Sequence, residues 1–184
     1  MFFFINGHHN AFFDFIMFWS SNKYIWIPLY LLFLYFLIRN YKKQTFVFFI
    51  FVILLIVLCD QTSVHLFKNV FQRLRPCHNP ALNGLIHTLN DRCGGQYGFV
   101  SSHASNIFGL TIFLIHFLGK KIKYFTPVIL VWAGIVSYSR IYLGVHYPAD
   151  VICGALLGCF IGFLIAKLYL CIQKKYPDKF LKCS

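Results

Sequence analysis

The chain has 184 residues, of which 59% are hydrophobic and 12% are charged, and its net charge is +12. A soluble domain of this size rarely carries so little charge, and long apolar runs predict one integral membrane domain over residues 1–184. The excess of Lys and Arg could indicate nucleic-acid binding. These residues gather in short loops between apolar segments, however, so no nucleic-acid partner is expected.

Five apolar segments predict membrane spans, and a shorter one precedes them. The stretch 10–19 is too short to span, so residues 1–20 are expected to hold a helix in the membrane interface. The expected fold class is therefore all-α, a polytopic membrane helical bundle of about five transmembrane helices plus an N-terminal interfacial helix. The spans are predicted at 24–38, from 46 to 75, and at 102–118, 125–138 and 150–170.

Two of these spans carry a further pattern. In the second, Lys68 and Arg75 would lie two turns apart on one helical face, roughly 10 Å along the axis at ~1.5 Å per residue. Pro at position 76 disfavours a helical Arg75, so this helix is predicted to end there. In the last span, Gly154, Gly158 and Gly162 are four residues apart, which should let a neighbouring helix approach closely.

Basic clusters predict which way the chain lies in the membrane. Clusters at 39–43 and 120–123 and the basic tail 172–184 alternate with the spans so that all three fall on one face. The positive-inside rule assigns that face to the cytoplasm. Several basic residues then lie on the outer face against the rule, which an anionic substrate would explain. They are Lys68, Arg73, Arg75, Arg92 and Arg140.

The polar loop 77–100 is predicted to lie outside the cytoplasm. Cys77 and Cys93 share this loop, and in an oxidising compartment they can form a disulfide. The alternative is two free thiols in a flexible loop. His78 and His87 lie in the same loop and are given no role, because no metal-binding spacing of His residues is found.

Three short polar stretches at the edges of these spans carry groups that suit phosphate chemistry. Lys and Arg side chains can neutralise phosphate oxygens. A Ser before an apolar helix is a preferred cap, and the free N–H groups of that helix end can bind an anion. The stretches are Lys68 with Arg75-Pro76, then Ser101-Ser102-His103, then Ser139-Arg140 with His146 and Asp150.

His146 and Asp150 are four residues apart, so one helical turn could bring them together. A carboxylate can hold an imidazole in the tautomer that leaves its other nitrogen free to attack. An ordinary interfacial His beside an N-cap Asp is the alternative for this pair, and a simple helix cap is the alternative for Ser101. Arg73 and Lys23 lie outside the pattern and are expected only to anchor the chain at the interface.

Together the three stretches resemble the type 2 phosphatidic acid phosphatase family, which also includes the vanadium haloperoxidases. The family's pattern is Lys-x6-Arg-Pro, then Pro-Ser-Gly-His, then Ser-Arg-x5-His-x3-Asp. The first and third parts match fully, whereas Val100 and Ser102 stand in place of the usual Pro and Gly of the second. The resemblance covers roughly residues 60–150 by motif.

The resemblance implies a role for each motif residue. His146 would attack phosphorus and form a phosphohistidine, Asp150 would orient it, and His103 would protonate the leaving group. Neither a metal nor another cofactor would take part. The phosphate would be held by Lys68, Arg75, Ser101, the N–H group of Ser102, and Arg140.

The activity implied by the resemblance is that of a lipid phosphate or diphosphate phosphatase. It would lie in the cytoplasmic (inner) membrane with its active site on the outer face, and its partners would be the membrane and a lipid phosphate. Undecaprenyl diphosphate is the first expectation for a member of this size. Lipid A phosphatases and phosphatidylglycerophosphate phosphatases share the same motifs, which recognise the phosphate and not the tail. The oligomeric state is left open.

Two other classes of protein could carry such residues. The haloperoxidases share the motifs but are soluble, and five apolar spans argue against that class. A membrane transporter of an anionic substrate would be expected to hold ionisable groups through the depth of the membrane. Here these groups gather near one face, apart from Asp60 and His65, which favours the phosphatase.

Overall fold

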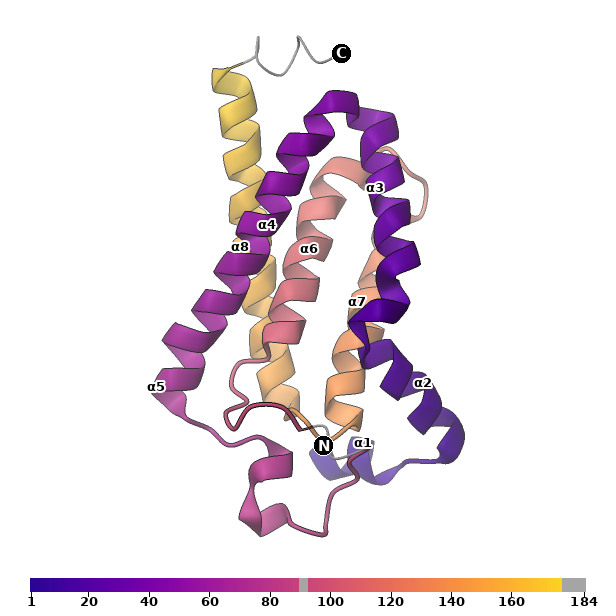
Figure 1. The fold of residues 1–184 in the computed structure, drawn as a ribbon, viewed down its shortest axis with the longest axis vertical. Helices are drawn as coiled ribbons and strands as arrows, with labels where there is room; N and C mark the ends of the chain where they lie inside the picture. The colour runs from indigo at the N-terminus through magenta and orange to yellow at the C-terminus, as the bar shows by residue number, and fades with distance from the viewer. Residues whose placement is uncertain (90–92, 177–184) are drawn as a thin grey trace.

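The computed structural model describes residues 1–89 and 93–176 of the chain. Within these residues the regular structure is helical, apart from one isolated antiparallel bridge between Leu74 and Tyr97. The chain is an all-α polytopic membrane bundle, as predicted. Its long helices are α3 (Ile27–Tyr41), α4 (Thr45–Thr62), α6 (Ser102–Leu118), α7 (Phe125–Tyr142) and α8 (Pro148–Lys175) (Figure 1).

Three helical stretches among the described residues are long and apolar enough to cross a membrane: Lys23–Phe71, Phe125–Tyr142 and Pro148–Lys175. The first is a hairpin rather than one rod. α3 and α4 run in opposite directions and meet at the short turn η2 (Lys42–Gln44), as Figure 1 shows. α6 has 17 residues and packs against α4, α7 and α8, which places it at the centre of the bundle.

The N-terminal segment forms two short helices beside the bundle. The helix expected at 10–19 is α2 (Ala11–Ser21), which begins where the side chain of Asn10 accepts a hydrogen bond from the Phe13 N–H group. A further helix, α1 (Phe2–Gly7), precedes it and was not predicted. α2 packs against α7. The first span was expected to begin at residue 24, and the apolar helical stretch begins at Lys23, with the 3-10 turn η1 (Lys23–Trp26) leading into α3.

The prediction that the second span continues as a helix to Arg75 is wrong. α4 passes into the π-helical turn η3 (Ser63–Lys68) and the short helix α5 (Asn69–Phe71), and the helix ends at Gln72, whose φ is 46°. Beyond this point the backbone bonds to a distant segment: the N–H of Arg75 donates to Gln96 at 3.1 Å. Lys68 and Arg75 therefore do not share a helical face. The reason is non-local, since residues 96–98 supply partners that compete with helix continuation.

The closest helix contact is between α6 and α8, and it confirms the expectation for the Gly repeat. A Cβ atom added at Gly154, Gly158 or Gly162 would lie closer than 3.0 Å to a backbone carbonyl oxygen of the segment that forms and precedes α6. Without side chains at these positions the two backbones can touch. This contact places the first turn of α6 beside the first turn of α8. Two of the motif stretches lie at these two turns.

Large apolar side chains cover the outer faces of the long helices. Among those at least 48% exposed are Phe46, Phe49, Ile53, Val131, Leu156 and Phe160. A soluble protein rarely exposes so much apolar surface, whereas a bilayer solvates it. α7 and α8 also extend beyond the predicted spans, to Tyr142 and Lys175.

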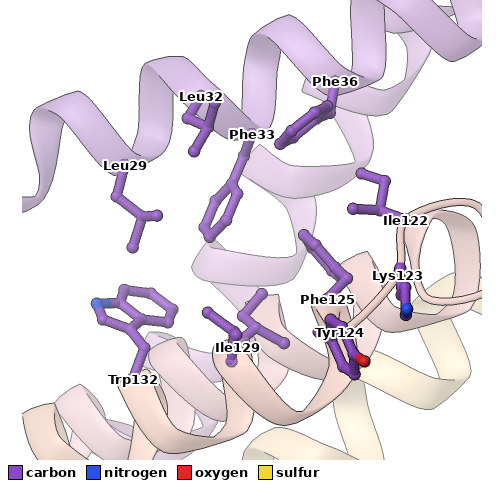
Figure 2. Close-up of a pocket in the computed structure, with 11 residues that line it drawn as sticks. Leu29, Leu32, Phe33, Phe36, Ile122, Lys123, Tyr124, Phe125, Ile129 and Trp132 are labelled. Atoms are coloured by element: carbon purple, nitrogen blue, oxygen red, sulfur yellow. The ribbon is translucent and has the colours of Figure 1, made fainter.

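α3 packs less tightly than its neighbours and leaves an apolar pocket of about 180 Å³ against α7. Figure 2 shows that Phe33 of α3 points toward Phe125 and Ile129 of α7, with Trp132 beside them. Lys123 and Tyr124 lie at one end of the pocket. Hydrocarbon, not phosphate, suits such a lining.

The two ends of the bundle differ in chemistry. The α3–α4 turn and the C-terminal end of α8, both basic, lie at one end, and the chain N-terminus with α1, α2 and α5 lies at the other (Figure 1). All three motif stretches gather at this second end. Arg92 and the tail residues 177–184 fall outside the described residues.

The close contact between α6 and α8 predicts a large difference between two Gly-to-Ala variants. Gly158→Ala should destabilise the fold by about 1–3 kcal/mol or more, because its Cβ meets the backbone oxygen of Ser105. Gly134→Ala is the matched control: no atom lies within 4 Å of its Cβ, and Ala favours a helix by up to ~1 kcal/mol. Thermal unfolding in detergent measures both, and equal midpoints for Gly158→Ala and the wild type would contradict the packing.

Candidate active site

A cavity of about 650 Å³ opens at the end of the bundle where the motif stretches gather. Three predicted site residues line it, namely Arg75, His103 and Arg140. The rest of the lining comes from the end of α2, the turn η1, the residues that follow α7, and the loop 77–100, which is the predicted outer loop. The cavity thus joins segments that are far apart in the sequence.

His146 does not line this cavity itself but contacts Arg75, which does, and only 1% of its surface is exposed. Its Nε2 atom is 3.0 Å from Nη1 of Arg75. A guanidinium group can only donate, so Nε2 accepts and the ring proton belongs on Nδ1. Nδ1 is 3.4 Å from Oδ2 of Asp150. The site therefore selects the tautomer in which Nε2 has a lone pair, as the role of nucleophile requires.

Asp150 is completely buried in the first turn of α8. The predicted closeness of Asp150 to His146 is confirmed, although no helical turn joins them, because His146 precedes the helix and Tyr147 is its N-cap. The Asp150 carboxylate accepts a hydrogen bond from the Tyr147 N–H at 2.8 Å. The N–H groups of Val145 and His146 both donate to the backbone oxygen of Arg140, which fixes the loop that carries His146.

The second motif stretch begins α6 as predicted. Ser101 is the N-cap, its side-chain oxygen accepts from the Ala104 N–H at 3.4 Å, and its own N–H donates to the backbone oxygen of Asp150 at 3.0 Å. The Ser102 hydroxyl, which stands in place of the family's Gly, accepts a hydrogen bond from Nζ of Lys68 at 2.7 Å. His103 is exposed to the cavity.

The sequence profile of the PAP2 superfamily matches residues 45–174. The chain belongs to the PAP2 superfamily. It is a membrane phosphatase that acts on lipid phosphates. The resemblance seen in the motifs is thereby confirmed, and the matched segment contains all eight predicted site residues.

Several named phosphatases and one solved structure are similar to this chain. A lipid A 4'-phosphatase of Bacteroides thetaiotaomicron is 40% identical over 88% of this chain and 72% of its own length. One of Porphyromonas gingivalis is 35% identical over 94% and 72%. An undecaprenyl-diphosphatase of Sulfolobus acidocaldarius is 32% identical over 80% and 65%. The crystal structure of Aquifex aeolicus LpxE covers 90% of this chain and 92% of its own with a TM-score of 0.64 at 24% identity, which supports the fold alone.

In this PAP2 phosphatase Arg73 is not the interfacial anchor that we expected. Its guanidinium donates to Oδ1 of Asp150 and lies over the rings of Phe99 and Tyr147, at 4.9 and 5.0 Å from their centroids. The local backbone explains the error. After the helix ends at Gln72 the chain is extended, and alternate residues of an extended chain share a side, so Arg73 reaches the same site as Arg75.

The N-terminal segment also contributes to the PAP2 site, which the sequence did not predict. Nη1 of Arg140 donates to the hydroxyl of Ser21 at the end of α2. Lys23, expected to be an interfacial anchor, lines the cavity together with Tyr24. Because 119 residues separate Ser21 from Arg140, no local pattern could have revealed the contact.

The outer loop closes the site from the remaining side. The structure joins Cys77 to Cys93 in a disulfide, with 5.9 Å between their Cα atoms, in agreement with the expectation. A Cβ atom added at Gly98 would lie 3.1 Å from Cγ of Arg75 and 3.2 Å from Oδ2 of Asp150. The absence of a side chain at this position lets the loop lie directly against Arg75 and Asp150.

The environment of His146 keeps its ring neutral. Burial lowers the pKa of this imidazole to about 4, and although Asp150 acts to raise it, the positive charges of Arg75 and Arg140 lower it further. A lowered pKa means that the protonated form accumulates only below about pH 4. At neutral pH the ring therefore keeps the lone pair that attack on phosphorus needs.

This lowered pKa can be observed directly. In NMR spectra of the detergent-solubilised enzyme with labelled His rings, the signal that is lost in His146→Gln should titrate with a midpoint near pH 4. A midpoint near the ordinary His value of about 6.5 would contradict this environment.

Proposed function

We propose that this PAP2 phosphatase removes a phosphate group from lipid A or a closely related phosphorylated glycolipid, through a phosphohistidine on His146. The chemistry is supported above all by one observation: His146 Nε2 contacts Arg75, which lines a cavity together with Arg140 and Lys23. The choice of lipid is supported by the relatives named lipid A 4'-phosphatase, which match this chain at 40% and 35% identity.

The reaction proceeds in two steps that the residues can support. Phosphate oxygens bind Arg75, Arg140 and Lys68 and the free N–H groups at the start of α6, which takes the Arg75 guanidinium away from His146. Nε2 of His146 then attacks phosphorus. A P–N bond forms, the bond from phosphorus to the lipid oxygen breaks, and His103 gives its proton to that oxygen.

The second step regenerates the enzyme. His103, now neutral, accepts a proton from water as the water oxygen attacks the phosphohistidine. The P–N bond breaks and inorganic phosphate leaves. Throughout, Asp150 faces Nδ1 and stabilises the positive charge that His146 gains when phosphorylated. No step requires a metal ion, because Lys and Arg neutralise the phosphate.

The position of the cavity suits a lipid substrate. It lies at the end of helices whose outer faces expose large apolar side chains, so a phosphorylated headgroup can enter while its tails stay in the bilayer. We further propose that this end faces the periplasm or the cell exterior. The proposal rests on the positive-inside rule, since the basic turns lie at the opposite end in a cytoplasmic (inner) membrane.

Undecaprenyl diphosphate, the first expectation from the motifs, is the second candidate. It is favoured by the relative named undecaprenyl-diphosphatase, at 32% identity. The relatives named lipid A 4'-phosphatase fit at least as well, and they cover more of this chain. The motifs do not separate these substrates, because the residues concerned contact phosphate and not the rest of the lipid.

A substrate panel tests the proposed function. Purified enzyme in detergent with EDTA should release phosphate from bisphosphorylated lipid A with the highest kcat/KM, ahead of undecaprenyl diphosphate and phosphatidylglycerophosphate. Vanadate should inhibit, since it mimics pentacoordinate phosphorus. A preference for undecaprenyl diphosphate would restore the second candidate, and activity that needs a divalent metal would contradict the mechanism.

The covalent intermediate is tested by variants of the catalytic pair. His146→Gln should abolish phosphate release, because no other described group is placed to attack. Asp150→Asn should reduce kcat by roughly 10³-fold or more, because the neutral side chain cannot stabilise the charged ring. Rapid acid-free quenching of wild-type enzyme with labelled substrate should trap phosphate on His146. His116→Gln, at the opposite end of α6, is the control and should retain full activity.

The sidedness of the site is tested by thiol labelling of intact cells. In a background that lacks Cys171 and the tail residue Cys183, Ala81→Cys in the outer loop should react with a membrane-impermeant reagent. Lys120→Cys in the turn before α7 should react only after the membrane is permeabilised. The reverse pattern would place the cavity in the cytoplasm.

A further inference from the structure

Three potential metal ligands from separate segments meet near the catalytic end of the molecule. His9 lies between α1 and α2, Asp14 lies in the first turn of α2, and His87 lies in the outer loop. One ligand atom of each lies within 4.8 Å of the other two. None of the three holds phosphate in the proposed mechanism. His87 was expected to have no role, because the His residues of the sequence show no metal-binding spacing.

We propose that His9, Asp14 and His87 bind one transition-metal ion, of which Zn²⁺ is the best fit, and that this ion is structural. Two imidazoles and one carboxylate are ligands that suit Zn²⁺, Co²⁺ or Ni²⁺ better than Mg²⁺ or Ca²⁺. Three protein ligands leave the fourth tetrahedral position to water. The proposal does not depend on which lipid is the substrate.

The spacing of the ligand atoms is close to that of an occupied site. Nε2 of His87 lies 2.9 Å from Oδ1 of Asp14, and the rings of His9 and His87 stack in parallel with centroids 3.7 Å apart. Metal–ligand bonds of about 2.0–2.2 Å in a tetrahedron place neighbouring ligand atoms roughly 3.3–3.5 Å apart. A metal ion lies close to the plane of each imidazole that binds it, so the ring of His9 must turn out of the stack with His87 to bind the same ion. His9 is exposed and lies outside any helix, so its side chain can make this rotation.

Buried groups behind the ligands hold them in place. The Tyr142 hydroxyl donates to Oδ1 of Asp14 at 2.7 Å. Asn6, which is 1% exposed, accepts from the His87 N–H and donates to the His87 carbonyl, both at 2.8 Å. Such outer partners commonly orient the ligands of protein metal sites. The pair of Asp14 and His87 is thus preorganised.

The position of the cluster indicates what a bound ion would do. Tyr142 ends α7, two residues beyond Arg140 and four before His146. Asn6 also donates to the Tyr142 carbonyl at 2.8 Å. An ion at the cluster would therefore tie α1, α2 and the outer loop to the end of α7, and would brace the wall of the cavity that α2 provides. It would affect stability, and the phosphatase chemistry would remain metal-free.

Metal binding by the full-length enzyme tests the proposal. After EDTA treatment and desalting in detergent, the wild type should bind one Zn²⁺ per chain in calorimetry, and Zn²⁺ but not Mg²⁺ should raise its Tm by several degrees. Co²⁺ should give the visible absorption bands of a tetrahedral site. His9→Gln and His87→Gln should each weaken Zn²⁺ binding at least about tenfold and remove the Tm shift.

A neighbouring residue provides the matched control. His8→Gln should bind Zn²⁺ like the wild type, since His8 turns to the Phe4 carbonyl instead. Phosphatase activity in EDTA, which should stay within about twofold of wild type in all three variants, shows that each one folds. The absence of Zn²⁺ binding in the wild type would overturn the proposal, as would binding that survives in both His9→Gln and His87→Gln. Neither result would affect the proposed reaction, which is measured without metal.

Discussion

The buried carboxylate of Asp150 is the group on which the catalytic end of the molecule depends. An ionised carboxylate without water is stable only when charges and donors surround it. Arg73 and the Tyr147 N–H supply them, and His146 lies beside it. The backbone oxygen of the same residue accepts from Ser101. The segments that carry the three motif stretches therefore meet at one residue, and the contacts that stabilise its buried charge also assemble the site.

Sequence patterns predicted the helices well where the signal is local. α6 lies where it was expected, because Ser101 caps its start and an apolar run fixes its extent. The Gly repeat of α8 likewise predicted, from its spacing alone, that a neighbouring helix would pack closely there. The predicted end of the second span was wrong. The helix ends at Gln72, and the backbone beyond it bonds to the distant residue Gln96, a pairing that no local sequence pattern indicates.

The residues of the candidate site also divide into those that a local pattern predicts and those that it does not. Groups that contact phosphate must be of fixed chemical type at fixed spacing, so the motifs identified Arg75, His146 and their partners. The residues that hold these groups are less constrained in type. Ser21 supports Arg140 across 119 residues, and Arg73 reaches Asp150 through an extended segment that had been expected to be helical. Supporting contacts of this kind depend on the tertiary fold and become visible only with it.

The hydrogen bond from Arg75 to His146 has a consequence for selectivity. The lone pair on Nε2 of His146, the proposed nucleophile, is engaged by the Arg75 guanidinium. A neutral molecule that enters the cavity offers the guanidinium a weaker acceptor than the one it has, so the exchange is unfavourable. A phosphate offers several charged oxygens, which bind the Arg75 guanidinium more strongly than Nε2 of His146 does. The ligand that frees the nucleophile is thus the one that the nucleophile should attack, and discrimination against uncharged electrophiles precedes any chemistry.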